Sequence, residues 1–417
     1  MRQPVSFSAG RDVPDRRDAW DAVFAVLCEG MAPGAPVFPR CLQDTETMLE
    51  FSPQCCDAME YLQLGQRCAA DLRGCWDALR PMGASLYFSV PFRLGLPVAP
   101  TIIAMNFTLM ALSIGLAVRV LPIRPVIGWP IALASHLAFM YGPALNSLSD
   151  VPAASLTLIA LWWLILGDRT DRVWMRVAAG AALGLAVSLR SFYLYPALLT
   201  ALASVGYILC CKRAVAAVFP LTLVLPILCQ YGATHSETGT WSFIDHRLTA
   251  SMEEMELRRS FWGYDTLLIG YNSAQGLPYT GCAPGGLREV MRTGDVTGAA
   301  CLLGKRLYFY FAGYTPGNKV YLTSAAERVF SPWIALTHAV WLAFAAYGAL
   351  KAPRTTSLIL PCVLVAFILL QGLIVHPESR YLICPYVFLW TLGVGTGPIA
   401  RGAARAVPVW RCVESAS

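Results

Sequence analysis

The sequence predicts an all-α polytopic membrane protein with about 9–10 transmembrane helices, extracytoplasmic loops and amphipathic juxtamembrane helices. The chain has 417 residues, of which 56% are hydrophobic and 14% are charged. Soluble domains contain about 45–50% apolar and about 25% charged residues. Long apolar runs recur along the chain, and the short loops between them alternate between rich and poor in Lys and Arg. Together these observations favour a membrane protein over a soluble domain.

The net charge of +6 does not by itself indicate a nucleic-acid partner. A nucleic-acid surface concentrates Lys and Arg in one patch or stripe. Here the basic residues are scattered among short loops between apolar runs, which is typical of signals that set membrane topology.

The apolar runs between residues 98 and 400 are interpreted as spanning helices, because lipid offers the backbone polar groups of an open strand or loop no partner. Several runs are shorter than the roughly 20 residues of a full span, so their predicted ends are approximate. The small residues of Ala178–Ala186 favour close contact between helices. The predicted spans are 98–119, 124–145, 151–167, 174–189, 192–211, 214–231, 330–350, 355–375 and 381–400.

The segments outside these spans complete the predicted organisation. Residues 1–56 lack the clean apolar core of a signal peptide or of a first span, and we interpret them as a degenerate or truncated first span. Residues 57–97 form a first extracytoplasmic loop with juxtamembrane helices, and residues 232–329 form a second, long one. Residues 401–417 form a basic cytoplasmic tail.

Basic residues set the predicted orientation. Among the short loops, twelve basic residues lie in one alternate set and only Arg190 and Arg380 lie in the other, so the first set is predicted to be cytoplasmic. This orientation requires the N-terminal region to cross the membrane, or to be translocated, before Asp57. The twelve are Arg119, Arg124, Arg169, Arg172, Arg176, Lys212, Arg213, Lys351, Arg354, Arg401, Arg405 and Arg411. The predicted outer segments are 57–97, 146–150, 190, 232–329 and 376–380.

Four of the 14 cysteines, Cys55, Cys56, Cys68 and Cys75, cluster just before the first long apolar run. A zinc site needs thiolates at finger-like spacing, closed by His or further Cys. Cys68 and Cys75 are seven positions apart with no His nearby, which disfavours zinc. A disulfide is compatible with an extracytoplasmic position, but the spacing leaves the pairing open.

Polar residues that carry chemistry fall in four places on the predicted outer face. Ionisable residues at membrane depth are expensive and are therefore candidates for function. The four groups are Asp57 with Glu60 and Tyr61, then Asp150 in the segment Asn146–Pro152, then Arg190 between two apolar runs, and then His376, Glu378, Arg380 and Tyr381.

Each group also has a structural interpretation. Asp150 could cap the helix that follows it, and Arg190 could reach from a helix end to the interface. Arg380 and Tyr381 could form an interfacial anchor, and Asp57 could be an ordinary solvated acid. The convergence of all four groups on one side favours the functional interpretation.

In their order along the chain, these residues resemble motifs of the glycosyltransferase-C superfamily, specifically its bacterial branch related to protein O-mannosyltransferases and the lipid A aminoarabinose transferase. The likeness spans roughly residues 55–400 and depends on motif order and predicted sidedness. The matching stretches are Asp57-x3-Tyr61-x3-Gly65, Arg80-Pro81-Met82-Gly83 with Phe92-Arg93-Leu94-Gly95, Ser149-Asp150-Val151-Pro152-Ala153-Ala154, Ala179-Gly180-x3-Gly184-Leu185-Ala186-x3-Arg190 and Arg380-Tyr381-x3-Pro385.

The chain departs from the family pattern at three points. A clean first transmembrane helix is missing from residues 1–56. Cys56 stands beside Asp57 where many relatives have a second acid, which weakens any inference about a metal site. Met82 stands where the family motif has a second proline.

The resemblance implies transfer of a hexosyl or pentosyl group from a polyprenyl-phosphate donor to a lipid, polysaccharide or protein acceptor. The reaction would take place on the extracytoplasmic face of a bacterial cell membrane, without nucleic acid, and a divalent metal is left open. Asp57 would be the general base, and Asp150 would orient the acceptor or the donor sugar. Arg380, with Arg190 or Arg80, would bind the leaving phosphate. Further substrate-binding candidates are Tyr61, Lys305, Arg306, His376, Glu378 and Tyr381.

Two other functions stay open on the sequence alone. A polytopic transporter or flippase for lipids or polysaccharides would also carry charged residues at the outer face, although such proteins tend to show internal repeats and none is seen here. The other is an inactive relative of the enzyme that has lost its first span.

Overall fold

A computed structural model describes residues 53–77, 80–144, 149–211, 217–244, 293–298, 300, 336, 340, 343, 356–374 and 382–396. The chain divides into two compact units, residues 1–57 and 58–417. The described helices belong to the second unit, except that the first of them begins within the last residues of the first unit. Within the described ranges the regular elements are helices, and no β-strand occurs among them.

The described helices match the predicted apolar runs closely. The run predicted at 330–350 falls almost entirely outside the described residues. The elements are α4 (Pro53–Ala70), η1 (Leu72–Cys75), α5 (Met82–Leu94), α6 (Val98–Val120), α7 (Pro125–Ala144), α8 (Asp150–Thr170), α9 (Val173–Leu189), η2 (Ser191–Tyr193), α10 (Leu194–Cys211), α11 (Val218–Thr238), η4 (Thr356–Leu358), α17 (Ile359–Ile374) and α18 (Ile383–Thr396).

Three of these helices, α6, α8 and α11, are long and apolar enough to cross a membrane. A full span needs about 20 residues, and these helices have 23, 21 and 21. The apolar parts of α7, α9, α10, α17 and α18 are shorter, at 10–17 residues. The described residues are thus all-α with three helices able to span a membrane, which agrees with the predicted class, while the number of spans stays a prediction.

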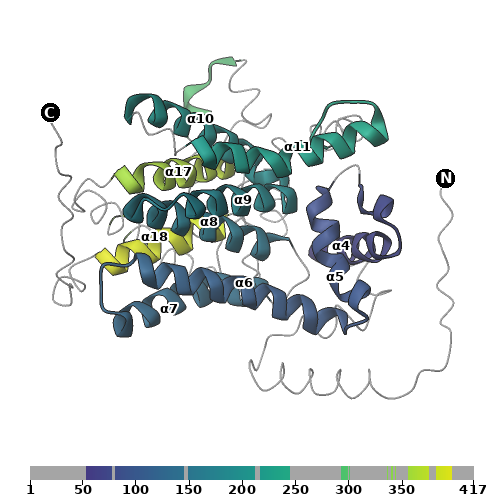
Figure 1. The fold of residues 1–417 in the computed structure, drawn as a ribbon, viewed down its shortest axis with the longest axis horizontal. Coiled ribbons are helices and arrows are strands. Elements are labelled where there is room, and N and C mark those ends of the chain that lie inside the picture. Colours follow the sequence, from purple (N-terminus) through teal and green to yellow (C-terminus); the bar gives the residue numbers. More distant parts are fainter. Residues whose placement is uncertain are drawn as a thin grey trace. The chain divides into compact units, whose positions relative to one another are not determined.

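Helix α8 is the most enclosed of the three long helices. It packs against α6, α9 and α18, and 83% of its apolar segment is buried, against 28% for α11. At its middle, the fully buried Trp162 stacks on Phe388 of α18, with 5.0 Å between the ring centroids. Figure 1 shows the long helices running alongside one another. Because neighbouring helices enclose α8, the position of its first residue, Asp150, is fixed.

Helices α9 and α11 approach closely through glycines of α9. A Cβ atom at Gly184 would lie 2.8 Å from both the Leu223 carbonyl oxygen and Pro226 Cγ. A Cβ at Gly180 would overlap Thr222 of the same partner helix. The close contact predicted for Ala178–Ala186 is thus confirmed, because small residues let two backbones meet.

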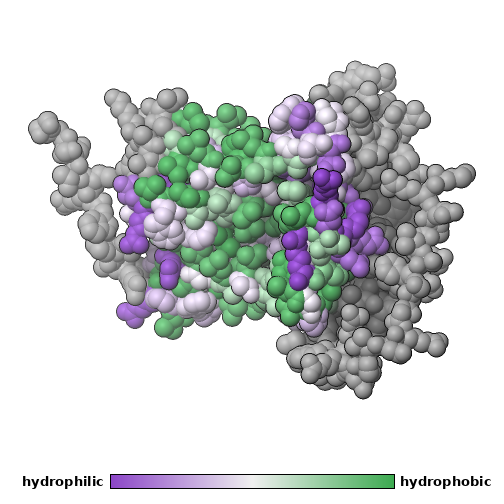
Figure 2. All heavy atoms as spheres, turned by 45° about the vertical axis from the view of Figure 1, so that its right-hand side comes forward, coloured by the Kyte–Doolittle hydropathy of each residue, from purple (hydrophilic) through white to green (hydrophobic). Residues whose placement is uncertain are grey.

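The opposite side of α11 is apolar and uncovered by the described residues. Leu221, Leu225 and Leu228 follow one another at helical spacing and are 71%, 64% and 57% exposed. Figure 2 shows a broad apolar surface with hydrophilic side chains gathered at its margins. Such a surface suits contact with lipid.

The end of α11 differs from the prediction, which placed it at residue 231. The helix continues to Thr238 and stops at Gly239, whose φ of 72° is left-handed. Within the added turns Thr234 is buried and donates a hydrogen bond to the Gln230 carbonyl oxygen at 3.1 Å. Hydrogen-bonded polar residues can therefore extend the helix beyond the apolar run that defines a span in the sequence.

Candidate functional site at one end of the bundle

A buried ion pair joins the start of α8 to the end of α9. Arg190 Nη1 lies 3.0 Å from Asp150 Oδ2, and the two side chains are only 8% and 3% exposed. Arg190 directly follows α9 in an extended conformation, with φ −150° and ψ 114°, which turns its side chain across to α8. The loops holding Asp150 and Arg190 thus lie at the same end of the bundle, as the alternation of basic loops predicted.

The structural interpretations of these two residues are both wrong. Asp150 is the first residue of α8, and neither of its carboxylate oxygens accepts a hydrogen bond from the helix backbone. It therefore does not act as a hydrogen-bonding cap, although a negative charge there still interacts favourably with the helix dipole. Arg190 does not extend to an interface, because it is buried against Asp150.

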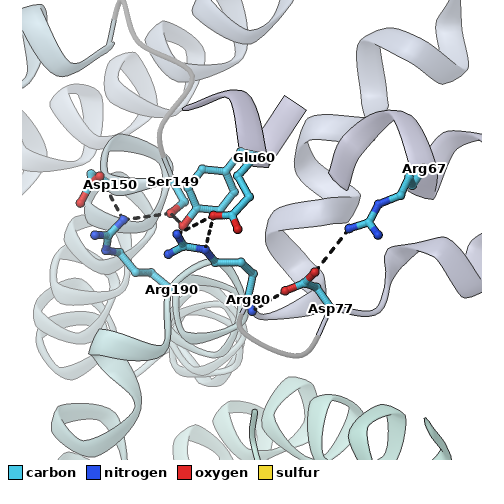
Figure 3. Close-up of polar contacts among 8 residues, drawn as sticks. Glu60, Arg67, Asp77, Arg80, Ser149, Asp150 and Arg190 are labelled. Carbon is cyan, nitrogen blue, oxygen red and sulfur yellow. Dashed lines mark hydrogen bonds and ion pairs between the residues drawn. The ribbon is translucent and has the colours of Figure 1, made fainter. Parts of the chain in front are cut away.

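Ser149 connects this ion pair to helix α4. Arg190 Nη1 donates a hydrogen bond to Ser149 Oγ at 3.1 Å, and Ser149 Oγ donates to the Tyr61 hydroxyl at 2.9 Å. Both Ser149 and Tyr61 are buried. Figure 3 shows the resulting chain of contacts from Asp150 to the α4 side chains. It joins residues 88 positions apart in the sequence.

Arg80 continues the chain of contacts toward solvent. Its guanidinium carbon lies 5.2 Å from the centroid of the Tyr61 ring, in a cation–π contact. Its Nη2 lies 2.8 Å from Glu60 Oε2, and this pair is partly exposed, at 25% and 44%. A partly exposed pair contributes about 0–1 kcal/mol. A competing anion can therefore displace Glu60 from Arg80 far more readily than it can displace Asp150 from Arg190.

A disulfide between Cys68 and Cys75 braces the stretch that carries Arg80. The bridge joins the last turn of α4 to η1, and Arg93 of α5 donates a hydrogen bond to the Cys68 carbonyl oxygen at 2.7 Å. The pairing that the sequence left open is thus decided in this structure. Disulfides persist in oxidising compartments, so this bridge agrees with the predicted extracytoplasmic position.

Asp150 is incompletely satisfied. Both of its oxygens are buried, yet neither has a hydrogen-bond partner among the described residues. The contact with Arg190 is short enough for an ion pair, but its geometry is not that of a hydrogen bond. A buried acceptor left without a donor costs about 1–3 kcal/mol. Asp150 therefore offers an acceptor to a hydroxyl group from water or from a ligand.

Several other buried polar side chains in the bundle hydrogen-bond to one another. His136 Nε2 lies 2.9 Å from Ser113 Oγ, and Trp162 Nε1 donates to the same oxygen at 3.2 Å. Ser135 and Thr391 hydroxyls lie 2.7 Å apart. These contacts join neighbouring helices, and we interpret them as structural.

Several predicted site residues lie outside the described part of the chain. Asp57 lies in α4, four residues before Tyr61, but its side chain is not described. The structure therefore brings together Tyr61, Arg80, Asp150 and Arg190 and leaves the others untested. Those others are Lys305, Arg306, His376, Glu378, Arg380 and Tyr381.

Ser149 was missed as a site residue in the sequence. Its position beside Asp150 at a helix start was a signal, because Ser is favoured at N-caps. The structure uses it differently, since its hydroxyl makes no cap hydrogen bond and bridges Arg190 to Tyr61 instead. Among the described residues, no group of three or more His, Cys, Asp or Glu side chains is placed to hold a metal ion.

Comparisons with protein-family models, with curated proteins and with solved structures find no match to this chain.

Proposed function

We propose that this protein is an integral membrane glycosyltransferase of the glycosyltransferase-C type. It transfers a sugar from a polyprenyl-phosphate donor to a lipid, polysaccharide or protein acceptor on the extracytoplasmic face of the membrane. The observation that carries the proposal is the contact chain Asp150–Arg190–Ser149–Tyr61. It joins predicted outer-face groups at one end of an apolar bundle, where a lipid-linked substrate would meet water.

Inverting transfer of a sugar has two chemical needs at such a site. A general base must take the proton of the attacking acceptor hydroxyl, and cationic groups must stabilise the charge that grows on the departing phosphate. Asp57 is the proposed base. It lies one helical turn before Tyr61 in α4, so the base and the contact chain share one helix.

The two described arginines take different roles in this proposal. Arg190 is buried, forms an ion pair with Asp150 and donates a hydrogen bond to Ser149, so it positions Asp150. Arg80 is one-quarter exposed and presents a guanidinium fork that suits phosphate. Phosphate binding would replace Glu60 on Arg80. Arg380, Lys305 and Arg306 are the other proposed phosphate contacts.

The open acceptor of Asp150 supports a sugar as the ligand. A sugar offers several hydroxyl donors, and one of them would complete the buried carboxylate that the described residues leave unmatched. Asp150 would thereby orient the sugar while Asp57 performs the proton transfer. The exposed apolar face of α11, with Leu221, Leu225 and Leu228, suits the polyprenyl chain.

The test is transfer of labelled sugar from synthetic polyprenyl-phosphate donors by the purified protein, with and without a chelator. Asp57→Asn is expected to abolish transfer while leaving expression and unfolding temperature unchanged. Asp171→Asn is the matched control, because Asp171 is exposed at the opposite end of α8, and it should transfer normally. Full activity of Asp57→Asn would refute the assignment of the base. Absence of transfer by the wild-type protein from every donor would refute the proposed function.

A further inference from the structure

The first turn of α5 is held by a side chain from a distant helix. Helix α5 begins at Met82 after Pro81, which makes no side-chain cap hydrogen bond. The first N–H groups of a helix have no partner within it. The Met82 N–H instead donates to Gln230 Oε1 of α11 at 2.7 Å. Gln230 is 2% exposed, so this hydrogen bond is shielded from water.

The same amide also holds the segment that follows α11. Gln230 Nε2 donates to the Phe243 carbonyl oxygen at 3.0 Å, and Thr234 Oγ1 donates to that oxygen at 3.3 Å. After Gly239 the chain folds back, so that the buried Phe243 ring packs on Tyr231, with 5.7 Å between ring centroids. Phe243 lies just before the greater part of the predicted outer loop, 232–329.

The two partners fix the orientation of the Gln230 amide. The Met82 N–H can only donate and the Phe243 carbonyl can only accept, so oxygen must face α5 and nitrogen must face Phe243. Glutamate could serve only Met82, and methionine could serve neither. Joining these two segments thus requires the amide group of Gln230, whereas filling the space between them would not.

This contact lies close to the candidate site. Met82 is two residues after Arg80, and the next residue, Gly83, packs on the end of α9. A Cβ at Gly83 would lie 2.5 Å from the Ser188 carbonyl oxygen, two residues before Arg190. The first turn of α5 therefore sets how Arg80 lies relative to Arg190. Further along α5, the Tyr87 hydroxyl donates to Asn106 Oδ1 at 2.9 Å, which holds the helix body independently of Gln230.

We propose that Gln230 is a positioning residue that couples the root of the long outer segment at Phe243 to the Arg80-Pro81 step. Its amide oxygen holds the first turn of α5, and with it Arg80, in place, while its amide nitrogen holds the segment at Phe243 back on α11. The catalytic consequence rests on the proposed function, whereas the positional claim can be tested without it.

The positional test is hydrogen exchange on the full-length protein in nanodiscs, followed over residues 80–88 and 240–244. Gln230→Met should speed exchange at least about tenfold in both stretches, because both hydrogen bonds are lost. Gln230→Glu keeps the acceptor for Met82 and loses the donor for Phe243, so only residues 240–244 should exchange faster. Gln371→Met in α17 makes the same chemical change away from α5 and should leave both stretches at wild-type rates.

Met82→Pro provides the reciprocal variant, and it keeps the test open if Gln230→Met does not fold. It removes the Met82 N–H without changing Gln230, and Pro81 already has the ψ of 142° that a residue before proline adopts. Faster exchange confined to residues 80–88 is expected. Wild-type exchange at residues 80–88 in both Gln230→Met and Met82→Pro would overturn the proposal, as would equal loosening by Gln371→Met.

The catalytic arm uses the labelled-sugar assay. Gln230→Met should reduce the transfer rate at saturating donor at least about tenfold, with a smaller loss for Gln230→Glu. If residues 80–88 exchange faster in Gln230→Met while its transfer rate equals that of wild type, the claim that the first turn of α5 positions Arg80 for transfer is overturned. If the wild-type protein transfers no sugar, the proposed function fails while the exchange result still decides the positional claim.

Discussion

Asp150 and Arg190 form a pair whose members depend on each other because both are buried. A buried ion pair adds little net stability over apolar residues of similar size, but removal of one partner leaves an uncompensated charge. The pair therefore holds Asp150 Oδ1 in position at the site, and it adds little to the stability of the protein.

A double-mutant cycle measures this dependence. Asp150→Asn and Arg190→Met should each destabilise the protein by about 3–5 kcal/mol, measured as unfolding in mixed micelles. The double variant Asp150→Leu with Arg190→Met should recover much of that loss, since no buried charge remains. In a matched cycle, the free energy of unfolding is measured for Asp150→Leu, for Arg190→Met and for the double variant. If the two single losses add up in the double variant, the two residues do not interact in the folded protein.

Tyr61 serves two neighbours with different parts of its side chain. Tyr61→Phe removes the hydroxyl that accepts from Ser149 and keeps the ring under Arg80. The variant should lose about 1–3 kcal/mol, because the buried Ser149 hydroxyl loses its acceptor. Ser149→Ala removes the same hydrogen bond from the other side, so the losses of the two single variants should be less than additive in the double variant in the same unfolding measurement. A Tyr61→Phe variant as stable as wild type would contradict the buried hydrogen bond.

At the scale of elements, glycine positions decide how closely helices pack. Gly65 of α4 meets the backbone of Phe88 in α5, and Gly83 of α5 meets Ser188 at the end of α9. These two contacts, with the α9–α11 contact, bring the site residues of α4, the Arg80 step and α9 together. Packing at glycine therefore contributes to the geometry of the site as well as to stability.

Gly184→Ala tests the α9–α11 contact. The new methyl group would overlap Leu223 and Pro226, and such overpacking typically costs about 1–3 kcal/mol. Gly206→Ala in α10 is the control, because a Cβ there meets nothing within 4 Å and alanine favours helix over glycine by about 1 kcal/mol. The first variant should unfold at a lower temperature than wild type and the second at an equal or higher one. The reverse order would contradict the close approach.

At the scale of the whole molecule, charge and burial separate the two ends of the bundle. At the end opposite the site, Arg169 donates to the Val120 carbonyl oxygen at 2.6 Å, and Arg176 pairs with Asp168 at 3.1 Å. Arg169 and Arg176 belong to the set of basic residues predicted to be cytoplasmic. The site end carries the Cys68–Cys75 disulfide, which agrees with an oxidising compartment.

Labelling of single introduced cysteines tests the orientation in intact cells. Glu237→Cys lies near the site end of α11, and Arg172→Cys lies at the start of α9; both positions are exposed. With the free native cysteines replaced by alanine, a membrane-impermeant maleimide should label Glu237→Cys alone until the membrane is permeabilised. Labelling of Arg172→Cys in intact cells would reverse the orientation.

Much of the fold could be read from the sequence because lipid imposes a simple rule. Backbone groups in an apolar medium must pair within the segment, so each long apolar run predicts a helix, and α6–α11, α17 and α18 formed where these runs occur. The end of α11 could not be read in this way, since it depends on hydrogen bonds that Gln230 and Thr234 make with Phe243, well beyond the apolar run.

The sequence by itself determined the all-α class, most helix bounds and the grouping of Asp150 and Arg190 at one end, because hydropathy and charge act locally along the chain. Tertiary structure alone decided that Arg190 pairs with Asp150, that Ser149 bridges to Tyr61, and that Gln230 holds Met82. These contacts join residues 40, 88 and 148 positions apart. Partners at such separations are chosen by how the helices pack, and no local pattern in the sequence records that choice.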